Sequence, residues 1–306
     1  MKTPWWFMRR GPMAWLLVPV SWIYYLLSRM VYGMRRLVVY TPRRPVICVG
    51  NILAGGVGKT PIVRCIASFL NAPVVMRGYK KSKHTASVGD EALMLSHAGI
   101  QVHTGNRKAN IRLLDHQKSD TPIVMDDGFQ NPKIKKTLSI IVFDARIGIG
   151  NGFMLPAGPL REGMGALRRA DAVIVIGSSK PNPRFKLPDG VKVFYATNRT
   201  INPFEPGTKL AAFAGIGYPK KFFDAIGADY RRSFPDHYQY TDSDIEKLMN
   251  WATRHGASLV TTEKDWMRLS PSVREKIKFA PLQTVIDNDF YIWLKEKISG
   301  NTNACD

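Results

Sequence analysis

The chain has 306 residues, of which 45% are hydrophobic and 22% are charged, so its composition excludes a disordered or fibrous protein. Its formal net charge of +20 indicates a polyanionic partner: a nucleic acid, an anionic membrane face or a phosphorylated substrate. Three cysteines without C-x-x-C spacing, Cys48, Cys65 and Cys305, favour a reducing compartment and argue against a structural zinc site.

The N-terminal segment has the composition of a membrane anchor. No charged side chain occurs from Gly11 to Ser28, and as a helix this run would reach roughly 27 Å, slightly less than a bilayer core of about 30 Å. Pro19 lies in its middle and is expected to kink the helix. Tryptophans and tyrosines around the run suit the membrane interface. We therefore predict an anchor helix over residues 1–36 that either spans the bilayer or lies in one leaflet.

Two alternatives apply to this segment. A cleaved signal peptide needs a small-residue cleavage site after the apolar run, where Arg29 and Met30 stand instead. A buried core helix is compatible with the length of the run, but the aromatic and arginine flanks favour the interface. More basic residues follow the run (Arg29, Arg35, Arg36, Arg43 and Arg44) than precede it (Lys2, Arg9 and Arg10). This bias predicts an inner-membrane protein with the remaining chain on the cytoplasmic side.

A phosphate-binding loop follows the first predicted strand. Residues 45–49 form a short apolar run typical of a buried strand, and apolar residues recur at helical spacing from Ile62 to Leu70. In such a strand–loop–helix unit, backbone N–H groups wrap the β-phosphate and the helix N-terminus adds a positive dipole. The predicted ATP-binding residues are Leu53, Ala54, Gly55, Gly56, Val57, Gly58, Lys59 and Thr60.

Two residues of this loop have specific expected roles. Lys59 is expected to reach the β- and γ-phosphates, and Thr60 to bind Mg²⁺. The strict P-loop pattern has glycine where Leu53 stands, and here Gly55 and Gly56 supply the permissive backbone. A glycine-rich turn followed by a chance Lys-Thr pair is the alternative, which the strand–loop–helix context disfavours.

Carboxylates follow at two places. Asp90, in Gly89-Asp90-Glu91, precedes an apolar helical segment and could be a helix N-cap or a catalytic group; its residue type leaves both open. Asp126 and Asp127 end an apolar strand over residues 121–125, the place where P-loop proteins complete a Mg²⁺ site. Turn chemistry is the alternative for this second pair.

Strand and helix patterns alternate along the remaining chain. The further strand-like runs are 138–143, 172–176, 191–195, 210–213 and 258–261, and the helical patterns lie near 106–116, 219–226, 243–254 and 290–298. This alternation predicts an α/β fold of the P-loop NTPase kind, with a mostly parallel sheet and helices on both faces.

The Pro-, Lys- and Gly-rich segment 178–190 is the predicted hinge between two lobes. We expect a P-loop lobe over 37–185, a second, smaller α/β lobe over 186–298 and a flexible tail over 299–306. His237 falls in the smaller lobe, in Phe234-Pro235-Asp236-His237, and is by itself a loop histidine of unknown role.

Together and in this order, the motifs resemble the tetraacyldisaccharide 4′-kinases of lipid A biosynthesis. The resemblance runs from the N-terminal segment to about Leu269. Besides the P-loop, the motifs that carry it are Arg77-Gly78-Tyr79, Gly89-Asp90-Glu91-Ala92, Asp126-Asp127-Gly128-Phe129-Gln130, Leu155-Pro156-Ala157-Gly158-Pro159-Leu160-Arg161-Glu162, Phe234-Pro235-Asp236-His237 and Thr261-Thr262-Glu263-Lys264-Asp265.

The resemblance implies transfer of the γ-phosphoryl group of ATP, with Mg²⁺, to the 4′-hydroxyl of an acylated glucosamine disaccharide 1-phosphate, forming lipid IVA. It implies that Asp90 is the general base and that His237 supports it. Because phosphoryl transfer depends mainly on positioning and charge stabilisation, we expect the catalytic cation Lys59, with Mg²⁺, to lower the barrier more than the base does. The implied metal ligands are Thr60, Asp126, Asp127 and, in an outer-shell role, Glu162. Because His237 and the P-loop fall in different lobes, we expect lobe closure to complete the site.

The chain departs from the family pattern at two positions. Asn131 stands where the family usually has histidine, which weakens a metal or orienting role there, and Gly163 stands where proline is common. The resemblance leaves Arg161 and Glu162 either a contact to lipid phosphate or an outer-shell magnesium role.

Two other classes of function compete with a kinase. The first is a membrane-associated P-loop ATPase or GTPase acting as a switch or assembly factor. Thr262-Glu263-Lys264-Asp265 lacks the spacer of a guanine-recognition motif, and Ile52-Leu53-Ala54 lacks the extra lysine of a dimeric deviant P-loop ATPase.

The second is a nucleic-acid-binding module, but the sequence contains no zinc-finger, RNP or bZIP pattern. We therefore expect the glycolipid substrate and an anionic membrane surface as partners, and no nucleic acid. The oligomeric state stays open.

Overall fold

The computed structural model describes residues 4–78, 89–177, 187 and 189–302. The chain falls into two compact units: the smaller comprises Gly89–His97 and Asn198–Gln283, and the larger comprises Thr3–Val88, Ala98–Thr197 and Thr284–Asp306. These limits differ from the expected lobes, because the larger unit also takes residues up to 197 and the C-terminal segment. The smaller unit takes residues 89–97 from within the P-loop half of the chain. Most of the predicted hinge, Tyr79 and the end of the predicted tail lie outside the described residues.

An eight-stranded sheet forms the larger unit, in the order β12-β7-β6-β5-β1-β4-β2-β3. Its strands are β1 (Val46–Gly50), β2 (Val74–Met76), β3 (Val102–Thr104), β4 (Ile123–Asp126), β5 (Leu138–Asp144), β6 (Ala172–Ile176), β7 (Lys192–Thr200) and β12 (Leu282–Ile286). β1 pairs in parallel with both β4 and β5, so its carboxyl end meets theirs at one edge. The expectation of a mostly parallel α/β sheet is confirmed.

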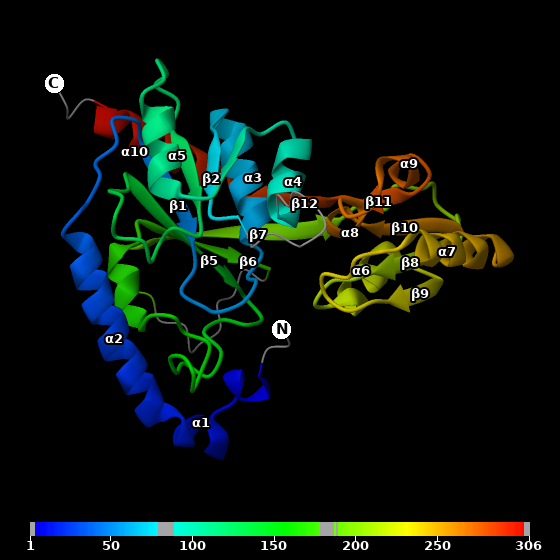
Figure 1. The fold of residues 1–306 in the computed structure, drawn as a ribbon, viewed down its shortest axis with the longest axis horizontal. Helices are drawn as coiled ribbons and strands as arrows, with labels where there is room; N and C mark the ends of the chain where they lie inside the picture. Colours follow the sequence, from blue (N-terminus) through cyan, green and yellow to red (C-terminus); the bar gives the residue numbers. More distant parts are fainter. Residues whose placement is uncertain (1–3, 79–88, 178–186, 188, 303–306) are drawn as a thin grey trace. The chain divides into compact units, whose positions relative to one another are not determined.

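The central strands are buried along their whole length, as expected for strands covered on both faces. The helices of this sheet are α3 (Lys59–Leu70), α5 (Arg107–Asp115) and α10 (Asn288–Thr302). α3 packs against β1 and β4, and α5 against β2, β3 and β4 (Figure 1). Asn106 caps α5 by accepting hydrogen bonds from the backbone N–H groups of Lys108 and Ala109, so this helix starts where the sequence pattern placed it.

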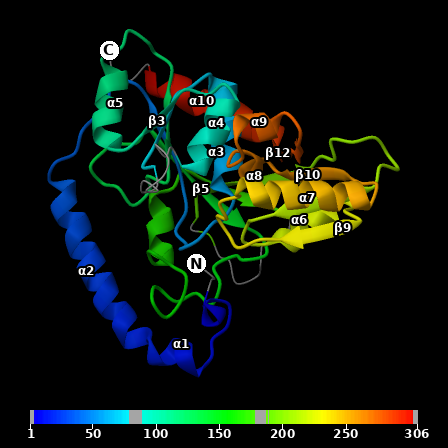
Figure 2. The ribbon, with the colours of Figure 1, turned by 45° about the vertical axis from the view of Figure 1, so that its right-hand side comes forward.

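The N-terminal segment forms a short 3₁₀ helix, η1 (Trp5–Phe7), followed by α1 (Pro12–Leu16) and α2 (Val18–Arg36). The expected interruption by Pro19 is seen as a break at Leu17, between α1 and α2 (Figure 2). Pro19 itself lies in the first turn of α2, where its missing N–H costs nothing. No helix among the described residues has the length and apolar character needed to span a bilayer.

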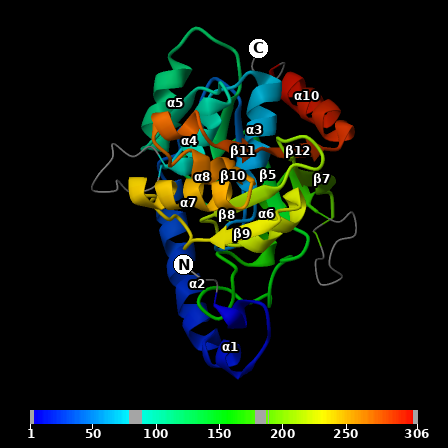
Figure 3. The same ribbon diagram turned by 90° about the vertical axis from the view of Figure 1, so that its right-hand side faces the viewer.

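A four-stranded parallel sheet forms the smaller unit, in the order β11-β10-β8-β9 (Figure 3). Its elements are α4 (Asp90–His97), β8 (Leu210–Ala214), α6 (Pro219–Ile226), β9 (Tyr230–Ser233), α7 (Asp242–Arg254), β10 (Ser258–Thr262), α8 (Glu263–Trp266), α9 (Pro271–Arg274) and β11 (Lys278–Ala280). α6 packs on β8, α7 on β10, and α4 on α8.

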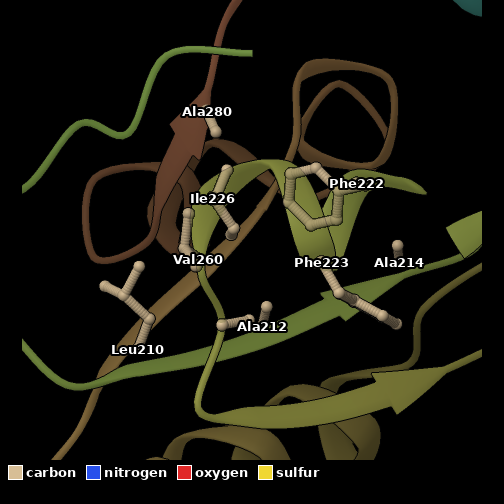
Figure 4. Packing of buried hydrophobic residues seen from close by; sticks show 9 residues of the cluster. Leu210, Ala212, Ala214, Phe222, Phe223, Ile226, Val260 and Ala280 are labelled. Atoms are coloured by element: carbon tan, nitrogen blue, oxygen red, sulfur yellow. The ribbon is translucent and has the colours of Figure 1, made fainter. Parts of the chain in front are cut away.

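Strand β8 divides the core of the smaller unit between two faces. Leu210, Ala212 and Ala214 face α6, whose Phe222 and Phe223 pack over them (Figure 4). Phe213 points the other way, into a cluster with residues of α7 and of the segment after α8. The alternation follows the two-residue period of a strand, and the small alanines leave room for the phenylalanine rings.

Candidate active site

The P-loop connects β1 to α3, and its shape depends on glycine at identifiable positions. A Cβ on Gly50 would lie 2.7 Å from the Cβ of Phe129, so the end of β1 can approach the 126–130 turn only with glycine there. Gly58, with a φ of 76°, directly precedes Lys59 at the start of α3. A left-handed backbone at this position is accessible to glycine at little cost.

Lys59 lies at the centre of a charged cluster beyond the ends of β1 and β4. Its Nζ is 3.0 Å from Asp127 Oδ1 and donates to Asn51 Oδ1 at 3.2 Å. The Nη1 of Arg161 lies 3.2 Å from Asp127 Oδ2. Burial would raise the pKa of Asp127, but Lys59 and Arg161 together outweigh burial and hold this pKa below its ordinary value. Asp127 is therefore an anion at neutral pH.

The backbone of Asp127 is held in the left-handed region, with a φ of 52°. Its N–H donates to Val49 O at 2.8 Å, and its carbonyl accepts from Arg107 Nη2 at 2.9 Å. Aspartate tolerates this conformation better than most residues. The two contacts fix the turn, which places the carboxylate beside Lys59.

The other expected metal ligands lie around this cluster. Thr60 is in the first turn of α3, and Asp126 is buried at the end of β4. Glu162 forms an ion pair with Arg169, at the end of the 3₁₀ helix η2 (Met164–Arg169), and its Oε1 is buried without a hydrogen-bond partner among the described residues. Asn131, at one departure from the family pattern, accepts from Lys133 N within its own turn.

The segment that carries Arg161 is held by α2. The hydroxyl of Ser21 donates to Met154 O at 3.0 Å and accepts from Ala157 N at 3.1 Å. Tyr24 donates to Arg161 O at 3.3 Å, and Arg169 donates to the hydroxyl of Tyr32 at 2.9 Å. One face of α2 therefore positions residues 154–169. This segment carries Arg161, which pairs with Asp127, and Glu162, one of the expected metal ligands.

The opposite face of α2 is apolar and exposed. Its exposed large apolar side chains are Val20, Trp22, Ile23, Leu26, Leu27, Met30 and Met34. Arg44, one of the basic residues expected to flank the anchor, is instead buried and bonded to Thr121 and Leu114. It is therefore a structural residue and does not belong to the basic surface.

Asp90 and His237 are in contact in the smaller unit. Asp90 begins α4, and His237 lies in the loop after β9 with a φ of 61°. The Nδ1 of His237 is 3.1 Å from Asp90 Oδ2, and Arg268 donates to the same oxygen. Burial would raise the pKa of Asp90, but the hydrogen bond and charge of Arg268, with help from Lys264 and His237, lower it. Two residues whose roles the sequence left open are thus brought together.

Three residues of these clusters were not predicted from the sequence: Asn51, Arg107 and Arg268. Asn51 follows the predicted strand after a single glycine, so its place beside Lys59 could have been expected. Arg268 lies one helical turn after Asp265, a weak signal for an ion pair. Arg107 reaches Asp127 only through the packing of α5, which the sequence does not encode locally.

Comparison with known proteins matches the same segments. A family model described as LpxK, tetraacyldisaccharide-1-P 4′-kinase, matches residues 13–299. A tetraacyldisaccharide 4′-kinase of Jannaschia sp. is 40% identical, covering 80% of this chain and 83% of that protein, and one of Rhodospirillum rubrum is 38% identical, covering 94% of each. The chain belongs to this family.

The fold agrees with a solved member of the family. The crystal structure of LpxK from Aquifex aeolicus in complex with ATP superposes with a TM-score of 0.75, at 24% identity, over 94% of this chain and 98% of that one. The likeness in fold covers most of the chain, and the family model over residues 13–299 includes both the P-loop and the Asp90–His237 pair.

Proposed function

We propose that this family member transfers the γ-phosphoryl group of ATP to the 4′-hydroxyl of tetraacyldisaccharide 1-phosphate, forming lipid IVA. The observation that carries the proposal is the contact between Asp90 and His237 in a chain that also carries a P-loop. A switch ATPase needs only the P-loop and a water molecule, whereas a kinase acting on a sugar hydroxyl gains from a carboxylate base held by a histidine.

The donor set beside the P-loop fits Mg²⁺. Thr60, Asp126 and Asp127 offer the hard oxygen ligands that this ion prefers, and Glu162 has a buried oxygen to spare. The described residues contain no group of three or more carboxylate, histidine or cysteine side chains suited to a metal. That agrees with an ion that takes one or two protein carboxylates and completes its shell with phosphate oxygens and water. When bound, Mg²⁺ neutralises charge on the phosphates.

The chain's own residues have separate roles in the transfer. Lys59 stabilises charge on the transferring phosphoryl group, and Arg161 keeps Asp127 oriented. Asp90 accepts the proton of the attacking hydroxyl, and His237 donates to the other oxygen of its carboxylate. Because phosphoryl transfer depends mainly on positioning and charge stabilisation, loss of Lys59 should cost more than loss of the base.

The exposed apolar face of α2 supports a membrane-bound site. With the basic side chains of Arg9, Arg10, Arg29, Arg35 and Arg36 exposed around it, this helix has the two faces of an interfacial amphipathic helix. We place the protein at the inner membrane, with α2 lying in the interface on the cytoplasmic side, where its glycolipid acceptor is embedded.

The test is transfer of labelled γ-phosphate from ATP–Mg²⁺ to tetraacyldisaccharide 1-phosphate in detergent micelles. Wild-type protein should label the lipid, and Lys59→Ala should lose at least about 10²-fold in kcat. Lys135→Ala, on a lysine away from the P-loop cluster, is the matched control and should keep its activity. ATP hydrolysis without lipid labelling would overturn the acceptor and favour the alternative, a membrane-associated P-loop ATPase.

A further inference from the structure

We infer that Arg268 is a positioning residue for the proposed base, holding one oxygen of Asp90 so that the other is left for the acceptor hydroxyl. The inference rests on the proposed kinase function and assigns distinct roles to the two oxygens of one carboxylate.

The geometry of Arg268 is that of a buried fork between two carboxylates. Its Nε and Nη2 donate to Asp90 Oδ2 at 3.0 and 2.5 Å, and its Nη1 donates to Asp265 Oδ1 at 2.8 Å and to Gly215 O at 3.1 Å. The side chain is 2% exposed, so water does not compete for these bonds. A planar guanidinium with both edges engaged fixes the direction from which Asp90 is held.

The far end of the fork is itself immobile. Asp265 is fully buried, and its Oδ2 accepts from Gly215 N at 3.0 Å and from the Thr262 hydroxyl at 2.7 Å. Its Oδ1 also accepts from the Tyr240 hydroxyl at 3.1 Å. Asp265 thus anchors Arg268 to the start of α8, and Arg268 in turn anchors the first residue of α4.

The contacts on Asp90 are one-sided. Oδ2 receives Arg268 twice and His237 Nδ1 once, whereas no hydrogen bond from the described residues reaches Oδ1. Oδ1 is therefore the oxygen that accepts the proton of the 4′-hydroxyl. In that step the hydroxyl oxygen bonds to the γ-phosphorus, the bond to the β–γ bridging oxygen breaks, and ADP leaves with the electron pair.

The surroundings of His237 fix its tautomer. Its Nε2 lies 3.3 Å from Lys264 Nζ, which can only donate, so Nε2 is the accepting nitrogen and Nδ1 carries the proton toward Asp90. Arg268 Nη2 lies 3.3 Å from Nδ1, but it is also a donor. It therefore forms no hydrogen bond with Nδ1 when Nδ1 carries the proton. Asp236 Oδ1, at 3.9 Å from Nε2, is the remaining charge that faces the ring. His237 Nδ1 thus donates to the oxygen that Arg268 holds.

The experiment compares Arg268→Gln, Arg268→Lys and wild type over a range of pH, using the full chain in micelles. In Arg268→Gln, kcat should fall about 10²-fold, with the KM for ATP little changed, and the acidic limb of the kcat/KM profile should move to higher pH. Arg268→Lys keeps the positive charge but loses the two-edged guanidinium. Its acidic limb should return toward the wild-type pH, and its kcat should be only partly restored. An unmoved limb in Arg268→Gln would overturn the inference.

Two further variants separate positioning from folding. Arg268→Gln/Asp265→Asn removes the charge that would otherwise be left buried and unpaired on Asp265, so the smaller unit should fold although Asp90 has lost its contact with Arg268. The acidic limb of this double variant should lie at the same higher pH as in Arg268→Gln. Arg274→Gln is the matched control, because Arg274 is another structural arginine of this unit, bonded to the carbonyls of Trp266 and Leu269. It should lower the Tm without moving the limb, and an equal shift in it would overturn the inference.

The NMR titration of the Asp90 carboxyl gives a readout that needs no turnover. Its pKa should rise in Arg268→Gln relative to wild type, and an unchanged pKa would overturn the inference about Arg268. If the pKa of Asp90 rises in Arg268→Gln but the wild-type chain does not phosphorylate the lipid, the inference about Arg268 stands and the proposed function is overturned.

Discussion

At the scale of single residues, Gly158 lies in the most crowded turn of the larger unit. A Cβ on it would meet Asn151 Oδ1 at 2.1 Å and the carbonyl oxygen of Phe153 at 2.3 Å. The amide of Asn151 is fixed in turn, because it donates to the carbonyls of Trp6 and Ala157. No flexible side chain can give way, so the backbone itself would have to shift.

We expect Gly158→Ala to lower the free energy of unfolding by about 1–3 kcal/mol, because the added methyl overpacks a fixed turn. Chemical denaturation measures this change. Gly163→Ala is the control, since the nearest atom to its Cβ would be Met154 Sδ at 4.0 Å, and it should stay within about 0.5 kcal/mol of wild type. Equal effects of the two substitutions would contradict the crowding argument.

Asp115 ties the segment before β1 to the end of α5. Its Oδ1 accepts from the backbone N–H groups of Arg43 and Arg44, both at 2.8 Å, and its Oδ2 from the Tyr40 hydroxyl at 2.7 Å. Burial would raise the pKa of Asp115, but these hydrogen bonds outweigh it and lower the pKa. The ionised form is therefore the one that stabilises the fold.

Because the folded-state pKa of Asp115 is lowered, its contribution to stability is present above the unfolded pKa of about 3.9 and is lost as pH falls through the folded value. The stability difference between wild type and Asp115→Asn should thus shrink as unfolding is measured at progressively lower pH. Asp224→Asn, which breaks an exposed pair with Arg231, should cost about 0.5 kcal/mol or less near neutral pH. A constant difference for Asp115→Asn would contradict the assignment.

At the scale of elements, α2 forms hydrogen bonds that hold a turn of the larger unit in place. Ser21 is buried in the first turn of the mostly apolar helix α2, and its hydroxyl accepts a hydrogen bond from Ala157 N in the turn that leads to Arg161. Removal of the hydroxyl would leave that N–H buried and unpaired.

Ser21→Ala should therefore cost about 1–3 kcal/mol of unfolding free energy. Ser28→Ala on the same helix is the matched control, because among the described residues the Ser28 hydroxyl only donates back to Tyr25 O, and it should cost about 0.5 kcal/mol or less. Thermal unfolding in detergent compares the two. If both variants unfolded at the same temperature as wild type, α2 would not be coupled to the turn.

Helices and strands were predicted well where the residues that determine them lie close together in the sequence. The P-loop lies between β1 and α3 as expected, and α6 covers the predicted 219–226 segment without change. The sequence could not predict which unit an element joins, because that depends on partners distant in sequence. Residues 89–97 show this, since α4 groups with α8 although its chain neighbours belong to the larger unit.

The candidate site divides in the same way. The residue types of Lys59, Asp127 and Asp90 indicated their chemistry, whereas Arg268 became visible only through its two carboxylate partners. A lone arginine after a short helix carries no pattern of its own. The expectation that lobe closure completes the site stays a prediction.

At the scale of the whole molecule, the net charge of +20 and the apolar face of α2 should act together at a membrane. Binding to phosphatidylcholine vesicles that contain phosphatidylglycerol should exceed binding to neutral vesicles and weaken as salt is added. Vesicle co-sedimentation measures this. Salt-independent binding, equal for both kinds of vesicle, would contradict the electrostatic part of the prediction.

The apolar part is tested by one pair of leucines. Leu26→Asp places a charge on the exposed face of α2 and should release most of the protein from vesicles. Leu113→Asp, at a leucine of α5 that is similarly exposed, should bind like wild type.

The interleaving of the two units along the chain has a consequence for biosynthesis. The smaller unit needs α4, whose His97 packs on Trp266 and Phe279, and the larger unit needs its C-terminal segment, where Tyr291 packs on Phe69. During translation, α4 emerges long before its partners, and the larger unit waits for residues 284–302, the last described part of the chain. The chain of the smaller unit is complete only at Gln283, and the larger unit still needs the segment that follows, so both should mature near the end of synthesis. No single cut in the chain would release either unit intact.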